Sequence, residues 1–111
     1  IHIIGDAING APMPKSAFIA SNTAKQAAAS AIAALRGEAA PEGVYFNTCY
    51  SRLAADQAIS IVGIFRPGPA GFVEVPNAGG LSPRGAPAAQ RRLEADYADG
   101  WYASITRDVF G

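Results

Sequence analysis

The spacing of apolar and polar positions changes along the chain, and these changes predict its elements. The first four residues, Ile1 to Ile4, are almost wholly apolar and predict a buried strand. Residues 13–36 are rich in Ala and predict a helix, with Pro14 in its first turn and Gly37 as its stop signal. The chain therefore begins, on this pattern, with a strand followed by a helix.

From Gly43 the period becomes two, which is typical of strands. One face carries Val44, Phe46, Thr48 and Tyr50. The other face is more polar and carries Tyr45, Asn47, Cys49 and Ser51. Residues 58–66 predict a second strand, 67–71 a turn, and 72–76 a returning strand closed by Pro76. We expect a short antiparallel sheet that is covered on both sides.

Residues 77–87 predict a loop, and residues 87–109 predict an amphipathic helix. Large apolar side chains recur there at every fourth position, at Leu93, Tyr97, Trp101, Ile105 and Val109. A core role is the favoured interpretation of Trp101 on spacing alone. The fold class that follows is α+β, a small antiparallel sheet flanked by two helices.

Composition excludes several classes of function. Nine basic and nine acidic residues cancel, so the chain lacks the positive field that holds nucleic acid or acidic lipid. No apolar run reaches the roughly 18 residues of a membrane span. One cysteine and one histidine cannot build a zinc site, so we expect no metal. If Cys49 takes part in redox chemistry, its partner lies outside these residues.

Three positions are candidates for chemistry, each with a plainer alternative. After an apolar strand, Gly5 would let a ligand approach the backbone and Asp6 could accept hydrogen bonds from a polyol, although Asp6 as a simple turn cap is favoured. Lys15 at a helix start would attract an anion, or be an ordinary solvated lysine. Cys49 is either a small core residue or a redox thiol, and composition does not decide between them.

Other familiar motifs fail. Ala11 and Pro12 stand where a phosphate loop needs Lys and Ser or Thr, and no G-x-G-x-x-G occurs. The sequence identifies no base near Ser16, Ser60 or Ser104, so a serine nucleophile has no support.

Six segments, in order from residue 1 to residue 111, resemble the C-terminal part of the flavoprotein subunit of flavocytochrome c sulfide dehydrogenase. They are IHIIGDA, PMPKSAF, FNTCYS, ISIVGIFRP, GGLSP and WYASITRDVFG, and MPKS followed by NTCYS is far more specific than a lone Gly-Asp. The resemblance implies a flavoprotein of the glutathione-reductase type. Residues 1–36 would be the last strand and helix of its FAD domain, and residues 37–111 its C-terminal interface domain, which binds flavin.

The resemblance also implies roles for single residues. Asp6 would bind the ribityl chain of FAD, with Gly5 allowing the approach. Cys49 would be half of a redox disulfide whose other cysteine lies in a preceding part of the same chain, and Trp101 would line the flavin site. The residues at the helix start would lie beside the flavin ring, namely Met13, Pro14, Lys15 and Ser16.

The implied activity is that of an FAD enzyme. Sulfide would attack the disulfide to give a persulfide, a thiolate would reduce FAD, and the electrons would pass singly to a cytochrome c subunit, in the periplasm. These 111 residues alone would be inactive and would self-associate through exposed apolar surface. Two alternatives are a small dimerisation domain without chemistry and part of a sulfide:quinone reductase, which would need a membrane-facing apolar tail that RDVFG does not provide.

Overall fold

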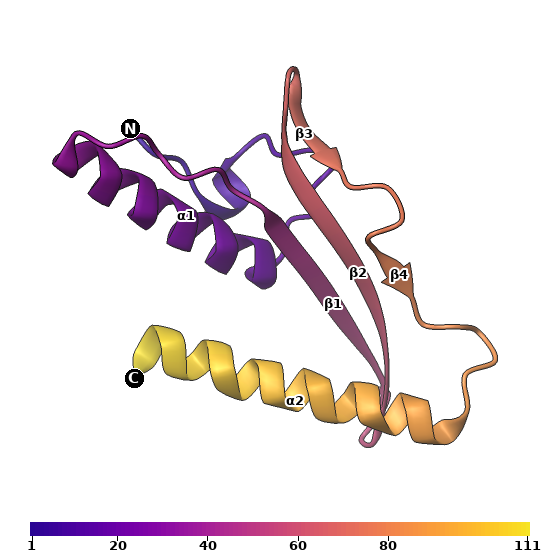
Figure 1. Cartoon of the computed structure of the whole chain (residues 1–111). Coiled ribbons are helices and arrows are strands. Elements are labelled where there is room, and N and C mark those ends of the chain that lie inside the picture. The colour runs from indigo at the N-terminus through magenta and orange to yellow at the C-terminus, as the bar shows by residue number, and fades with distance from the viewer. The chain divides into compact units, whose positions relative to one another are not determined.

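A computed structural model describes all 111 residues and shows an α+β fold with two helices and a small antiparallel sheet, which confirms the predicted class (Figure 1). A short 3-10 turn, η1, precedes the first helix. The elements in chain order are η1 (Gly5–Ala7), α1 (Ala17–Arg36), β1 (Tyr45–Ala54), β2 (Gln57–Gly68), β3 (Gly71–Glu74), β4 (Gly80–Leu81) and α2 (Ala88–Phe110).

The chain forms two compact units, and β1 and β2 each contribute to both. The first unit comprises residues 1–47 and 63–79, and the second comprises residues 48–62 and 80–111. The expected division into an FAD-domain segment, 1–36, and an interface domain, 37–111, stays a prediction.

Local signals set the limits of α1. The Ser16 hydroxyl accepts a hydrogen bond from the Ile19 N–H at 3.1 Å and caps the helix, so Pro14 lies before the helix and its expected place in the first turn is wrong. At the other end Gly37 adopts φ 70°, and the Glu38 N–H donates to the Ala33 carbonyl at 2.9 Å. The predicted stop at Gly37 is confirmed.

The expected opening strand is not formed. Residues 1–4 belong to no sheet, and Ile1, Ile3 and Ile4 are exposed. A strand is stable only when a neighbouring strand pairs with its backbone, and none of β1 to β4 pairs with this segment. The apolar pattern alone could not supply that neighbour.

The sheet follows the predicted order, β1-β2-β3, with a tight turn between β2 and β3. β2 and β3 are antiparallel, with Phe65 opposite Glu74 and Gly68 opposite Gly71. The segment predicted to be a loop, residues 77–87, contains the short strand β4, which pairs with β2 through Leu81 opposite Ile61. Two residues are too few to show a period.

A small core lies in the first unit. It contains Met13, Ile19, Tyr45 and Phe65. Phe72 packs against it, and the rings of Tyr45 and Phe72 lie edge to face with their centroids 5.3 Å apart. The expected cover on both faces of the sheet is wrong, because side chains such as Phe46 and Ile61 stay exposed.

In the second unit α2 begins after Pro87, as predicted. Its apolar stripe is not a core, since Leu93 is 47% exposed and Tyr97 is 55% exposed. The buried residues of α2 are Glu94 and Ala95, which lie between the stripe residues Leu93 and Tyr97 in the chain. Neither helix is long and apolar enough to cross a membrane.

Candidate functional site

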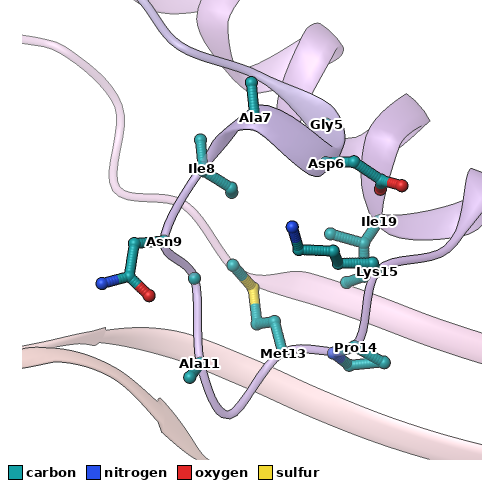
Figure 2. Close-up of a pocket in the computed structure, with 11 residues that line it drawn as sticks. Gly5, Asp6, Ala7, Ile8, Asn9, Ala11, Met13, Pro14, Lys15 and Ile19 are labelled. Atoms are coloured by element: carbon teal, nitrogen blue, oxygen red, sulfur yellow. The ribbon is translucent and has the colours of Figure 1, made fainter.

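A pocket of about 340 Å³ lies in the first unit, between η1, the loop that follows it and the start of α1 (Figure 2). Its volume is within the range of small-molecule sites, roughly 300 to 1,000 Å³. Of the six predicted cofactor-binding residues, all but Ser16 line it: Gly5, Asp6, Met13, Pro14 and Lys15.

Gly5 fixes the η1 wall of the pocket. Its φ is +60°, a conformation that favours glycine, and its N–H donates to the Thr23 hydroxyl of α1 at 3.0 Å. That hydroxyl in turn donates to the Ile19 carbonyl at 2.9 Å. The turn that carries Asp6 is therefore bonded directly to α1.

The apolar part of the pocket comes from Ile8, Met13 and Ile19. Met13 and Ile19 are buried core residues. The loop passes closely over Met13 and Ile8 at Gly10, where an added Cβ would lie 2.9 Å from the Met13 methyl carbon. A bulkier residue there would displace the end of the Met13 side chain.

The charged groups of the pocket are Asp6 and Lys15, both exposed. Figure 2 shows the Lys15 side chain extending into the space between η1, the loop and Ile19. Lys15 also precedes the start of α1, where the helix dipole is positive. The pocket thus combines an apolar wall, a hydrogen-bond acceptor and a cationic edge.

Ser16 lies just outside the pocket lining and faces β1. While its oxygen caps α1, its hydroxyl donates to Asn47 Oδ1 at 2.6 Å. Asn47 is only 3% exposed. This contact joins residues 31 positions apart, so no local pattern could have predicted it.

The two residues predicted to be catalytic belong to the second unit. Cys49 lies half-buried on β1, and Trp101 lies half-buried on α2. The pocket belongs to the first unit. That Cys49 and Trp101 share one flavin site with the pocket residues stays a prediction.

Sequence reasoning missed a polar cluster in the second unit, in which Glu94 is buried and Ser60 and Ser82 are half-buried. The Ser82 hydroxyl donates to Glu94 Oε2 at 2.5 Å, and Ser60 lies beside it, with 3.4 Å between the two hydroxyl oxygens. The Ser60 N–H donates to the Ser82 hydroxyl at 2.7 Å. The structure thus places the Glu94 carboxylate beside Ser60, a neighbour that the sequence did not identify because Ser60, Ser82 and Glu94 lie far apart along the chain.

This cluster is suited to holding α2 rather than to nucleophilic catalysis. The hydrogen bond from Ser82 is the main cause that lowers the pKa of Glu94, and a carboxylate with a lowered pKa is a weak base. Burial, and secondarily the negative charge of Glu94, raises the pKa of Tyr50. No three His, Cys, Asp or Glu side chains group together as metal ligands would.

A family model matches more than half of the chain. Its description is flavocytochrome c sulphide dehydrogenase, flavin-binding, and it covers residues 41–110. The matched range includes Cys49 and Trp101 and all four strands, whereas the pocket residues precede it.

Proposed function

Because the chain belongs to the family of flavin-binding domains of flavocytochrome c sulphide dehydrogenase, we propose that it is the C-terminal part of a longer FAD-dependent subunit that oxidises sulfide. The family match over residues 41–110 is the observation that carries the proposal. The matched range includes β1, which carries Cys49, the only cysteine of the chain.

The first-unit pocket is the proposed place for part of the FAD. A flavin ring is flat and apolar with polar edges, and the pocket offers an apolar wall beside one cation and one carboxylate. Asp6 accepts hydrogen bonds from the hydroxyls of the ribityl chain, and η1 keeps it in place through Gly5 and Thr23. When bound, FAD supplies an acceptor for two electrons that can be passed on one at a time.

Lys15 and the start of α1 place positive charge at the edge of the flavin. This charge stabilises an anionic, reduced ring over a neutral, oxidised one, and each 1.4 kcal/mol of such preference raises a two-electron potential by about 30 mV. Since Lys15 is exposed, solvent screens part of the effect.

Cys49 is proposed as one half of a redox disulfide, with the second cysteine in a preceding part of the same polypeptide. Hydrosulfide attacks this disulfide, forms a new sulfur–sulfur bond with one cysteine and releases the other as a thiolate. A second hydrosulfide would remove the outer sulfur of the persulfide as hydrodisulfide, and the two cysteine sulfurs would then re-form their disulfide, with bound FAD supplying the acceptor for the electron pair. Trp101 lines the site, and a cytochrome c subunit in the periplasm receives the electrons.

Replacing Cys49 tests the chemistry. In the full FAD-containing subunit, Cys49→Ser should abolish the loss of visible flavin absorbance on adding sulfide, while FAD remains bound, because a hydroxyl cannot form the disulfide. Ser51→Ala, two residues further along the same face of β1, is the matched control and should react like the wild type. Normal flavin reduction in Cys49→Ser would overturn the disulfide mechanism.

A further inference from the structure

We propose that Asn47 is a positioning residue of the flavin pocket. Asn47, on β1, holds Ser16 in place through a hydrogen bond, and Ser16 in turn holds the two pocket-lining residues that precede it, Pro14 and Lys15. This inference rests on the proposed binding of FAD beside Lys15. It assigns a role to a buried side chain two positions from Cys49 on the same strand.

The hydrogen-bond geometry gives Asn47 control over the Ser16 hydroxyl. A serine hydroxyl has one hydrogen, and here that hydrogen goes to Asn47 Oδ1 at 2.6 Å. The lone pairs of the oxygen are then directed elsewhere, and one accepts the Ile19 N–H at 3.1 Å. Asn47 therefore fixes the orientation in which Ser16 caps α1.

The cap determines where the pocket wall lies. Ser16 directly follows Pro14 and Lys15 in the chain, so a change in its backbone moves both residues. Ile19, whose N–H the cap binds, also lines the pocket. The hydrogen bond between Ser16 and Asn47 thus supports pocket residues on both sides of Ser16 in the chain, Lys15 before it and Ile19 after it.

A second contact between α1 and β1 offers a matched comparison. The Phe46 N–H donates to Asn22 Oδ1 at 3.4 Å, and Asn22 Nδ2 donates to the Phe18 carbonyl at 2.8 Å. Asn22 also joins helix to strand, but it does not line the pocket and does not touch the cap. Its removal should weaken the junction without moving Lys15.

The test measures FAD affinity and midpoint potential in the full FAD-containing subunit. Asn47→Ala and Ser16→Ala should each weaken FAD binding several-fold, and the double variant should bind no worse than the weaker single one, because both remove the same hydrogen bond. Asn22→Ala should lower the unfolding temperature but leave affinity and potential as in the wild type.

Asn47→Asp separates positioning from folding, because a carboxylate keeps the acceptor for Ser16. It should retain FAD binding within about twofold, whereas Asn47→Ala should not, because only the alanine variant loses the acceptor for Ser16. Additive losses in the double variant, or FAD binding in Asn47→Asp as weak as that in Asn47→Ala, would overturn the role of Asn47. A wild-type subunit that binds no FAD would overturn the proposed function as well, and so distinguishes the two failures.

Discussion

At the scale of single residues, Glu94 shows how a polar group can replace the apolar contact that spacing suggests. It is 8% exposed and sits one position after Leu93, which is largely exposed. Glu94 accepts hydrogen bonds from Ser82 and, at 3.3 Å, from Gln90. A buried carboxylate needs such donors, and their presence turns α2 so that Glu94 rather than Leu93 faces inward.

Glu94 should make the second unit sensitive to acid. Its folded-state pKa is lowered from the ordinary value of 4.5, chiefly by the hydrogen bond from Ser82. Glu94 therefore contributes fully to the free energy of unfolding above about pH 4.5, and this contribution is lost as the pH falls through the folded-state pKa. The unfolding temperature of the wild type should therefore fall more steeply below about pH 4.5 than that of Glu94→Gln, as circular dichroism melts would show. Parallel curves for the two proteins would contradict this role.

Asp6 should contribute to FAD binding without supporting the fold. Its side chain is exposed, so Asp6→Ala should leave the unfolding temperature nearly unchanged. Losing hydrogen bonds from an ionised acceptor to the ribityl hydroxyls costs about 1.5 to 3 kcal/mol, a tenfold or greater loss of FAD affinity. Titration calorimetry with FAD on the full apo-subunit would measure this loss of affinity. Glu74→Ala, an exposed carboxylate on β3, is the control, and an equal loss there would contradict a specific role for Asp6.

At the scale of elements, the sequence predicted what depends on neighbours in the chain. Gly37 and Pro87 marked helix limits, because each acts through its own backbone. The turn predicted over 67–71 is shorter in the structure, because Pro67 and Gly68 pair within β2 and Gly71 begins β3. The opening strand and the core role of the α2 stripe failed, because both depend on partners distant in sequence. The pocket residues came together because they follow one another from Gly5 to Lys15, whereas the contact between Ser16 and Asn47 had no local signal.

The end of α1 offers a test of backbone conformation by itself. Gly37 has φ 70°, and a Cβ added there would meet nothing within 4 Å, so any cost of substitution comes from the backbone. Gly37→Ala should destabilise the chain by about 1 kcal/mol, because the left-handed region disfavours L-residues. Gly37→Asn should cost less, since Asn adopts this region more readily. Thermal unfolding would compare them, and equal costs would contradict a conformational origin.

At the scale of the whole molecule, both units leave large apolar side chains in contact with water. In the first unit these include Ile1, Ile3 and Leu35, and in the second Leu93, Tyr97 and Phe110, which is 82% exposed. Proteins that remain monomeric rarely expose apolar surface on this scale in contiguous form. On α2 the exposed positions recur at helical spacing, which gathers Leu93 and Tyr97 on one face.

The 111-residue chain on its own should therefore self-associate, and the α2 stripe should contribute to it. Sedimentation velocity should show a mass that rises with concentration. Association buries apolar surface, and each Å² removed from water stabilises the associated state by about 25 cal/mol. Replacing Leu93 and Tyr97 together by Lys should shift the chain towards monomer, while replacing Lys25 and Glu38, which are exposed and already polar, by Gln should not. A wild-type chain that stays monomeric at all concentrations would show that these exposed faces are tolerated in water.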